Sequence, residues 1–255
     1  MKPARIALPE PTSTAPAYNQ RTWPQYAHAI RSCGGVAVPV PLGESQASVA
    51  RLISGCCGIL LPGSPADVNP QKYNQSPAAE TAAPDPDREA VDELLLQDAF
   101  NLHKPIFGIC YGLQALNVWR NGTLRQHISG GLHAQSRLET VHPVLVTAGS
   151  RTALALDRSH APEGPVWVNS SHHQSVQISG DGMEIVALSP DDGVIEALEL
   201  THGSQFVVGV QWHPERTFGT NALSRALFQS FVDAASAWKL EPIQESVVLV
   251  DTCKK

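Results

Sequence analysis

The sequence contains no apolar run long enough to cross a membrane, no run of Lys or Arg and no Cys-x-x-Cys pair. A membrane-spanning helix needs about 20 mostly apolar residues, so we expect the protein to stay out of the bilayer. Its 18 basic residues face 24 acidic ones, which leaves a net charge of −6. Because binding to nucleic acid requires clustered cations, this balance argues against nucleic acid as a main partner.

Cysteine is scarce and irregularly placed. The chain has five cysteines, two of which are neighbours. An odd number at irregular spacing indicates free thiols in a reducing compartment, and the apolar stretch at residues 4–8 is too short for a signal peptide. We therefore predict a cytoplasmic protein. Core or surface thiols are expected at Cys33, Cys56, Cys57 and Cys253.

Apolar residues are plentiful by contrast. They make up 42% of the 255 residues, which is enough to bury a sizeable core. In the first half, short apolar runs alternate with segments of helical spacing, and this order predicts a mostly parallel sheet with helices on both faces. The predicted strands are 4–8, 36–40, 57–62 and 105–109, and the predicted helices are 24–35, 87–103 and 111–119.

The second half changes to short strands in close succession, separated by turn signals. The strands, which we predict to be antiparallel, are 142–148, 166–170, 184–189, 194–200 and 206–212. The whole chain thus predicts an α/β fold with a mostly parallel central sheet and an additional antiparallel portion, closed by a helix over 220–238. We expect a single domain over 1–240, a tail over 241–255 and a long loop over 64–86.

The stretch GICYGLQALNV, residues 108–118, places Cys110 between an apolar strand and a helix. A side chain at such a corner points out of the carboxyl edge of the sheet, where α/β proteins bind ligands. Gly108 and Gly112 permit the close backbone approach that a sharp strand–turn–helix needs. Unpaired N–H groups at the start of the helix favour a thiolate, so Cys110 is a candidate nucleophile.

A nucleophilic cysteine needs a base, and GVQWHPE at residues 209–215 supplies a candidate at the end of another strand. His213 and Glu215 are two residues apart, so in an extended chain both side chains leave the same face. The Glu215 carboxylate would then hold the far N–H of the His213 imidazole, as the orienting group of a catalytic triad does.

Two backbone segments are placed to stabilise an oxyanion. Tyr111 follows the candidate nucleophile at the start of a helix, where its N–H is free to donate. The stretch LLPGS, residues 60–64, ends another predicted strand. The N–H groups of Gly63 and Ser64 could therefore face Cys110 from the adjacent strand.

The remaining histidines predict no metal centre. His127, His133 and His142 fit none of the standard ligand spacings, and we expect neither a metal nor an organic cofactor. His172 and His173 follow VWVNS as a polar pair in a loop. Such a loop could equally pack and bond locally.

In their order along the chain, the PGS loop, GICYGLQ and the late HPE resemble the class I glutamine amidotransferases, which use a Cys-His-Glu triad on an α/β sheet. Five stretches are similar to the free-standing γ-glutamyl hydrolase branch, known best for γ-glutamyl-γ-aminobutyrate hydrolysis in putrescine breakdown. They are LLPGSPADVNPQKY (60–73), the segment 87–118, NGTLRQHI (121–128), VNSSHHQSV (168–176) and DDGVIEALE (191–199). The resemblance spans about residues 4–235. The chain departs from the usual pattern at Ser64, where glycine is common, and at Tyr111, where this branch often has arginine.

The resemblance implies a flavodoxin-like fold and a cysteine hydrolase of γ-glutamyl amides. Cys110 would attack the γ-carbonyl, while His213, aided by Glu215, would transfer the protons. A γ-glutamyl thioester would form and then be hydrolysed to glutamate.

The resemblance also assigns substrate contacts and partners. It implies that Gln114 contacts the glutamyl group and that the segment with His172 and His173 flanks the site. The partner would be a small γ-glutamyl compound. The sequence leaves the amine and the oligomeric state open, a homodimer included.

Two other functions stay open at this point. The chain could be a glutaminase subunit that passes ammonia to a separate synthetase, since nothing in it resembles a synthetase domain. It could also be a non-catalytic regulatory module on the same fold, although the intact Cys110, His213 and Glu215 argue against that.

Overall fold

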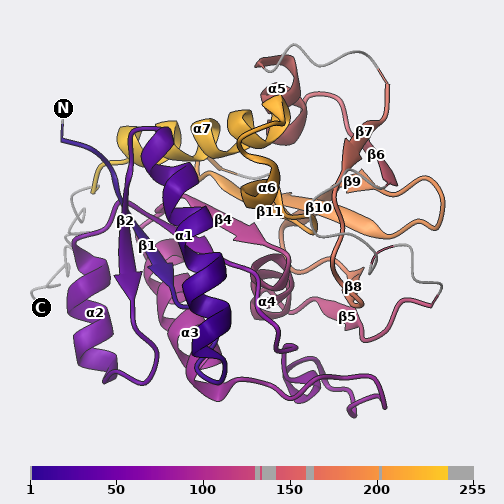
Figure 1. The fold of residues 1–255 in the computed structure, drawn as a ribbon, viewed down its shortest axis with the longest axis horizontal. Coiled ribbons are helices and arrows are strands. Elements are labelled where there is room, and N and C mark those ends of the chain that lie inside the picture. The colour runs from indigo at the N-terminus through magenta and orange to yellow at the C-terminus, as the bar shows by residue number, and fades with distance from the viewer. Residues whose placement is uncertain (1, 130–132, 134–141, 159–163, 201–202, 241–255) are drawn as a thin grey trace, which may run out of the picture.

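A computed structural model describes residues 2–129, 133, 142–158, 164–200 and 203–240 of the chain. Within these residues one large mixed sheet runs through the molecule (Figure 1) in the order β2–β1–β3–β4–β11–β10–β9–β6–β7, with β8 and β5 attached beside β10. None of the described helices is long and apolar enough to span a membrane.

Five neighbouring strands form the parallel part of the sheet, and their order is that of a flavodoxin-like fold. These strands are β2 (Val36–Val40), β1 (Arg5–Pro9), β3 (Gly58–Leu61), β4 (Ile106–Ile109) and β11 (Val207–Val210). The first four match the predicted strands, and β2 lies at the edge that Pro39 requires. The prediction of an α/β fold with a mostly parallel central sheet is therefore confirmed.

The antiparallel part continues the sheet from β11. Its strands are β10 (Ile195–Leu200), β9 (Met183–Leu188), β6 (His142–Val146), β7 (Val166–Val168), β8 (Ser175–Ile178) and β5 (Thr123–Arg125). The strand predicted over 206–212 was expected to be antiparallel only. In the structure β11 is antiparallel to β10 and parallel to β4, so it joins the two parts of the sheet.

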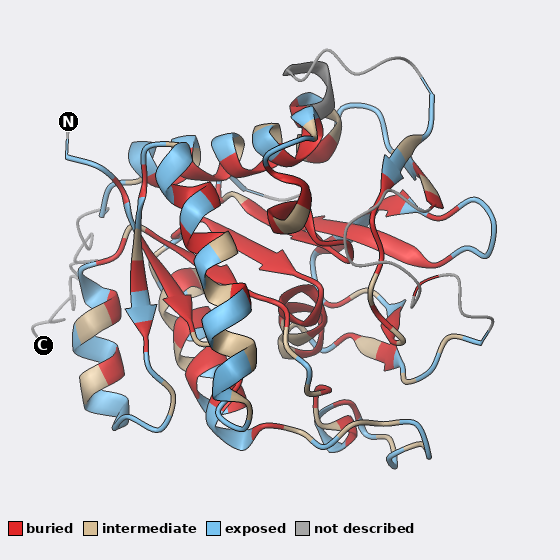
Figure 2. Cartoon of the chain, in the orientation of Figure 1, coloured by how far each residue is buried: buried red, intermediate tan, exposed pale blue. Residues whose placement is uncertain are grey.

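Helices cover both faces of the parallel part, as alternate strand residues predict. In β4, Phe107 and Ile109 face one hydrophobic cluster with α1 and α7, whereas Ile106 faces a second cluster with α2, α3 and α4. Figure 2 shows the inner strands β1, β3, β4 and β11 as a mostly buried layer between these helices, whereas the edge strand β2 is partly exposed. The helices are α1 (Pro16–Ser32), α2 (Gln46–Ser54), α3 (Pro86–Asn101), α4 (Tyr111–Trp119), α5 (Arg151–Arg158), α6 (Pro214–Thr217) and α7 (Ala222–Ala237).

Several local predictions need correction. The helix predicted over 24–35 begins eight residues earlier at Pro16. Proline suits the first turn of a helix. The sequence has a proline at both 16 and 24, and the prediction took Pro24, which lies inside the helix, for its start. The elements α2, α5, β5 and β8 were not predicted, because each is short, with three to nine residues, and a short segment carries little sequence signal.

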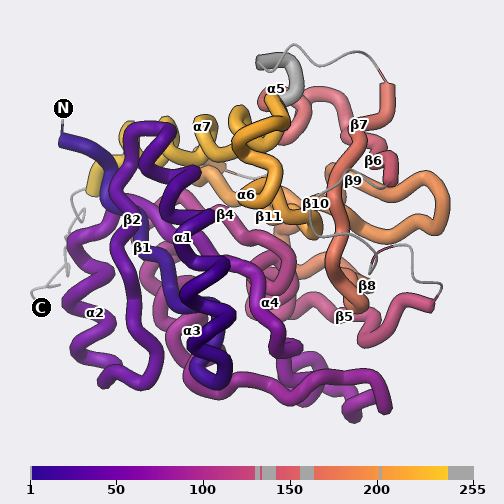
Figure 3. Tube along the Cα trace, viewed as in Figure 1, coloured from indigo at the N-terminus to yellow at the C-terminus, as the bar shows by residue number. Residues whose placement is uncertain are grey.

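The connection between β3 and α3 runs away from the sheet (Figure 3) and contains a short 3₁₀ turn at Pro70–Tyr73. It is otherwise loop, as predicted. The predicted single domain over 1–240 stays a prediction, and the tail over 241–255 lies outside the described residues.

Candidate active site

Cys110 occupies the one-residue corner between β4 and α4. Its backbone has φ 53° and ψ −108°, a conformation that is costly for a residue with a side chain. The corner is held on both sides, because the Cys110 N–H donates to Val210 O at 2.8 Å and Gln114 N–H donates to Cys110 O at 3.1 Å. The strain therefore persists because the ends of β4, β11 and α4 all impose it.

Two glycines let the strand and helix meet at this corner. A Cβ at Gly108 would lie 2.8 Å from Gly112 O, and a Cβ at Gly112 would collide with the carbonyl group of Leu61. Neither approach is possible for a larger residue, so the spacing Gly-x-Cys-x-Gly is a steric requirement of the turn.

His213 and Glu215 form a buried pair. The Nδ1 atom of His213 lies 2.8 Å from Glu215 Oε1, and both residues are nearly inaccessible to water. The sequence predicted this pairing in extended chain. The structure instead starts the helical turn α6 directly after His213 and brings Glu215 back beneath the imidazole. The pairing is as predicted, but the local geometry that produces it was wrongly assigned.

The electrostatics of the pair follow from this contact. Burial lowers the pKa of His213, but the carboxylate of Glu215 and the Cys110 side chain raise it further, to about 9. Burial raises the pKa of Glu215, but the neighbouring His213 lowers it more, so that it ends below its ordinary value. At neutral pH His213 is therefore an imidazolium next to an ionised carboxylate.

The side chain of Asn169 holds the backbone of His213 in place. This role was not predicted from the sequence. The Asn169 side-chain amide donates to His213 O, and its Oδ1 accepts from His213 N, both at 2.8 Å. Asn169 belongs to the VNSSHHQSV stretch, which the resemblance in sequence had already connected with the site. Its hydrogen-bond partner His213 is 44 residues away, so the contact itself could not be seen in the sequence.

The PGS loop, residues 62–64, lies directly against the side chains of Cys110 and His213. A Cβ built on Gly63 would be 3.0 Å from His213 Cε1 and 3.6 Å from Cys110 Cβ. The Gly63 N–H donates to the Tyr26 hydroxyl at 3.1 Å, so it is already occupied. Among the described residues no partner takes the N–H of Ser64 or Tyr111, and these two N–H groups are free to bind an oxyanion.

The side chain of Tyr111 points away from the site. It is fully buried in the second hydrophobic cluster, and the Arg88 guanidinium lies over its ring at 4.8 Å from the centroid. The unusual tyrosine beside Cys110 therefore contributes its backbone to the site, and its side chain packs behind the sheet.

A cavity of about 380 Å³ opens over Cys110 and His213. Ser64 and Ser171 line it, and so do residues that sequence reasoning did not single out: Tyr18, Arg21, Thr22, Gln25, Pro65 and Arg216. Tyr18, Arg21 and Thr22 were missed because the helix was expected to begin at residue 24, whereas Gln25 lay inside the predicted helix with no signal that placed it at the site. Arg216 directly follows the HPE motif, and this position is a signal from which the sequence could have placed it near the site.

The guanidinium group of Arg216 has one nitrogen without a hydrogen-bond partner among the described residues. Its Nη1 atom is buried without a hydrogen-bond partner in the described part of the chain, while its Nε lies 3.5 Å from Glu215 Oε1. A buried cationic donor at the wall of a cavity is suited to binding a carboxylate.

The residues expected to bind the glutamyl group have other partners. Gln114 is buried and donates to Gln174 O at 3.2 Å and to Gln211 Oε1 at 3.1 Å. His172 is buried and its Nδ1 donates to Gln174 O at 2.8 Å. His173 is partly exposed and its Nε2 lies 3.2 Å from Asp67 Oδ1, which ties this segment to the loop after β3. None of the three lines the cavity.

A flavodoxin-like sheet with a buried Cys-His-Glu arrangement at its carboxyl edge defines the glutamine amidotransferase-like class of proteins. The family model of Peptidase C26 matches residues 7–215. The γ-glutamyl-γ-aminobutyrate hydrolase PuuD of Escherichia coli K12 is 32% identical over 223 residues, which are 82% of this chain and 84% of that protein. A Mycobacterium tuberculosis protein assigned as a glutamine amidotransferase is 36% identical over 219 residues, 84% of this chain and 67% of its own length.

A solved structure agrees on the fold. The crystal structure of a Thermoplasma acidophilum protein assigned as one of the GMP synthase subunits has a TM-score of 0.61, with 15% identity over 92% of this chain and 96% of that one. The match of the family model, together with the relatives above 30% identity, shows that the chain belongs to the Peptidase C26 family of class I glutamine amidotransferase-like proteins. It is a glutamine amidotransferase-like hydrolase.

Proposed function

We propose that this protein hydrolyses the γ-glutamyl amide bond of a small γ-glutamyl amine, with Cys110 as nucleophile, His213 as acid and base, and Glu215 as the orienting group. The observation that carries the proposal is the buried 2.8 Å contact between His213 and Glu215 beside a cysteine held in a strained corner at a cavity. The hydrolase named for γ-glutamyl-γ-aminobutyrate among the relatives supports the same bond type.

The first half-reaction uses the charge state of the pair. Imidazolium at His213 favours the Cys110 thiolate, which attacks the γ-carbonyl carbon of the substrate. The resulting oxyanion accepts hydrogen bonds from the N–H groups of Tyr111 and Ser64. As the C–N bond breaks, protonated His213 gives its proton to the departing amine, and a γ-glutamyl thioester remains on Cys110.

The second half-reaction reverses the proton transfer. Neutral His213, held by Glu215, takes a proton from water while the water oxygen attacks the thioester carbonyl. The C–S bond then breaks, glutamate leaves and the Cys110 thiolate and the His213 imidazolium are restored. No external oxidant, reductant or cofactor is needed for this cycle.

The cavity wall indicates which end of the substrate is recognised. Arg216 presents a buried, unpartnered Nη1, and Arg21 is a second cation on the wall. We assign the α-carboxylate of the glutamyl group to this side. The volume of about 380 Å³ suits a dipeptide-sized molecule, such as a γ-glutamyl compound of γ-aminobutyrate. A role in polyamine breakdown is what the family resemblance adds to this proposal.

The test is glutamate release from purified full-length protein incubated with glutamine and with a panel of γ-glutamyl amines, with the Cys110→Ser variant as control. We expect Cys110-dependent release from at least one γ-glutamyl amine without any added protein. Release from none of them would contradict the proposal and favour a regulatory module. Cleavage of glutamine only after addition of a synthetase would favour a glutaminase subunit.

A further inference from the structure

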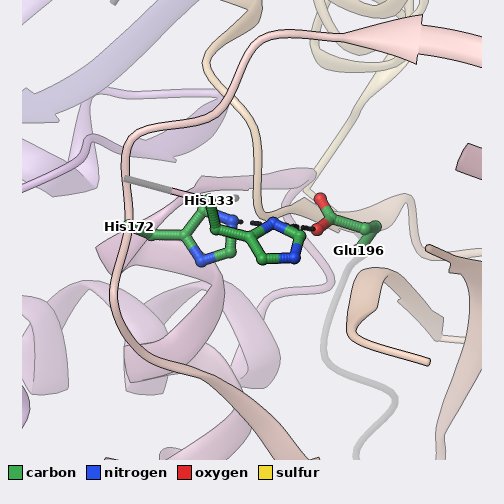
Figure 4. Close-up of side chains that lie close together, drawn as sticks. All are labelled: His133, His172 and Glu196. Atoms are coloured by element: carbon green, nitrogen blue, oxygen red, sulfur yellow. Dashed lines mark ion pairs between the residues drawn. The ribbon is translucent and has the colours of Figure 1, made fainter. Parts of the chain in front are cut away.

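Three histidines and a glutamate from different parts of the chain meet in the interior, and none of the four lines the cavity over Cys110 and His213. This histidine–glutamate cluster consists of His133, His142 at the start of β6, His172 and Glu196 in β10. All four side chains are at least nine-tenths buried. Figure 4 shows His133, His172 and Glu196 pointing toward one another.

The imidazoles converge on one carboxylate oxygen. Glu196 Oε1 lies 3.5 Å from His133 Nδ1, 3.7 Å from His142 Nε2 and 3.7 Å from His172 Nε2. The ligand atoms of His133, His172 and Glu196 all lie within 4.8 Å of one another. These distances are too long for hydrogen bonds.

The outer nitrogen of each ring identifies its tautomer. His133 Nε2 lies 2.8 Å from Asp192 Oδ2, His142 Nδ1 lies 3.1 Å from Pro143 O and His172 Nδ1 lies 2.8 Å from Gln174 O. A carboxylate or carbonyl oxygen only accepts, so each of these nitrogens carries the proton. In the neutral rings the nitrogen that faces Glu196 is then a bare lone pair.

The centre of the cluster therefore holds acceptors and lacks a donor. His142 Nε2, His172 Nε2 and both oxygens of Glu196 have no hydrogen-bond partner among the described residues. Ser170 Oγ comes within 3.4 Å of His133 Nδ1, but it donates its proton to His133 O at 2.8 Å. Four buried lone-pair groups facing one another are unfavourable unless a metal cation or a proton lies between them.

We propose that this cluster binds one divalent transition-metal ion, with Zn²⁺ the best match, through His133 Nδ1, His142 Nε2, His172 Nε2 and Glu196. Imidazole and carboxylate are regular ligands of Zn²⁺. With bond lengths of about 2.0–2.1 Å, tetrahedral ligands lie about 3.3 Å apart. The observed 3.5–3.7 Å separations from Glu196 Oε1 are close to this value, and the ligand atoms of His133, His172 and Glu196, which lie within 4.8 Å of one another, would draw together around the ion, with His142 completing the set. The proposal replaces our expectation from sequence spacing that the chain has no metal.

The oxygens around the cluster contact its histidines as they do around a metal centre. Each imidazole donates its outer N–H to an oxygen, which is the arrangement that orients histidine ligands and raises their basicity. Four protein ligands would leave no open position, so the ion would be structural. It would join β6, β10 and the segment before β8, where Ser171 lines the cavity and Asn169 holds His213. The proposal stands apart from the proposed function, since neither Cys110 nor His213 is a ligand.

The test is metal binding by the full chain in a Cys110→Ser background, which removes the thiolate as a competing ligand. Protein without a histidine tag, stripped with a chelator, is titrated with Co²⁺ and then with Zn²⁺. We expect one Co²⁺ per chain with the intense visible bands of four-coordinate Co²⁺, displacement by Zn²⁺, and a thermal midpoint that rises when Zn²⁺ is added. Glu196→Gln and His142→Gln should each weaken binding by about 100-fold or more.

The matched control is His28→Ala, which removes an exposed histidine of α1 and should leave binding unchanged. Glu196→Gln keeps the shape of the side chain, and circular dichroism establishes that each variant is folded. If the stripped protein takes up no stoichiometric Co²⁺ or Zn²⁺, or if folded Glu196→Gln and His142→Gln variants both bind as tightly as the parent, the proposal is overturned. The cluster would then hold a shared proton.

Discussion

At the scale of single residues, the site depends on what each atom of His213 contacts. Its backbone N–H and C=O are both taken by Asn169, its Nδ1 by Glu215, and its Nε2 has no nitrogen or oxygen partner in the described part of the chain. Three contacts thus orient the ring and leave Nε2 free for Cys110 and the substrate. The imidazolium form is strongly favoured by this environment.

The raised pKa of His213 predicts the pH range of activity. Below about 9 the ring is protonated and can donate to the departing amine, and above that value the proton is lost. We therefore expect kcat/KM to fall as the pH rises through about 9. The measurement is a profile from pH 6 to 10.5. Glu215→Gln removes the charge that raises this pKa and should move the fall to lower pH. A fall centred near 6.5 in the parent would contradict the assignment.

The protonated His213 also predicts that Cys110 is more reactive than the other cysteines. Iodoacetamide near neutral pH should alkylate Cys110 faster than the other four cysteines, of which Cys33 and Cys56 have pKa values raised by burial to about 11. In His213→Asn the rate at pH 6 should fall by about tenfold or more, since the stabilising cation is gone. Peptide mapping after timed quenching measures this. Equal labelling of all cysteines in the parent would show that Cys110 is not activated.

Arg216 predicts a preference for the substrate α-carboxylate. We expect Arg216→Ala to raise KM about 10- to 100-fold with a smaller change in kcat, because a charge-assisted contact is worth about 1.5–3 kcal/mol. Parent protein should prefer a γ-glutamyl substrate over its α-carboxamide analogue, and the variant should lose that preference. Arg31→Ala, which removes an exposed cation of α1, is the control. A preference that survives in Arg216→Ala would refute the assignment.

At the scale of elements, the corner at Cys110 exists because glycines let α4 pack closely on β3 and β11, the two strands that flank β4. Gly112 lies against Leu61 of β3, and Gly209 of β11 lies against Leu113. The helix is thereby drawn so close to the sheet that the chain must turn within one residue. The strained backbone at Cys110 is thus a consequence of packing between elements.

This close contact predicts a large effect of one methyl group. Gly112→Ala should destabilise the fold by about 3 kcal/mol, since the new Cβ meets the backbone of β3 and cannot rotate away. Gly219→Ala is the matched control, because nothing lies within 4 Å of its Cβ position and its φ is ordinary. Urea denaturation compares the two. Equal stability of both variants would show that α4 can move off the sheet.

At the scale of the whole molecule, Arg88 joins segments that are far apart in sequence. Its fully buried guanidinium donates to Pro11 O after β1 and to Pro62 O after β3, and it pairs with Asp92 at 2.8 Å. Pro62 precedes Gly63 of the site. The loops at the carboxyl edge of two parallel strands are therefore held by one cation from α3.

Loss of this cation should weaken the whole fold. We expect Arg88→Met to lower the free energy of unfolding by about 3–5 kcal/mol, since Asp92 would be left buried and unpaired. The double variant Arg88→Met with Asp92→Leu removes the orphaned charge and should recover part of the loss. Urea denaturation measures both. A single variant as stable as the parent, or a double variant less stable than the single, would contradict this account.

The sequence by itself determined what depends on local spacing. Gly108 and Gly112 around Cys110, the apolar runs of β1, β3 and β4, and the His213-Pro-Glu215 order each act over a few residues, so pattern alone predicted the corner, the parallel sheet and the contact between His213 and Glu215.

Only the tertiary structure decided which groups meet across the chain. It occupied the Gly63 N–H with Tyr26, turned Gln114 toward Gln174 and Gln211, and brought Arg216 to the cavity wall. It also gathered His133, His142 and His172 around Glu196, although the spacing of His127, His133 and His142 in sequence indicated no metal site. Hydrogen bonds and ligand geometry depend on distances set by the closure of long loops, and periodicity along the chain carries no information about those distances.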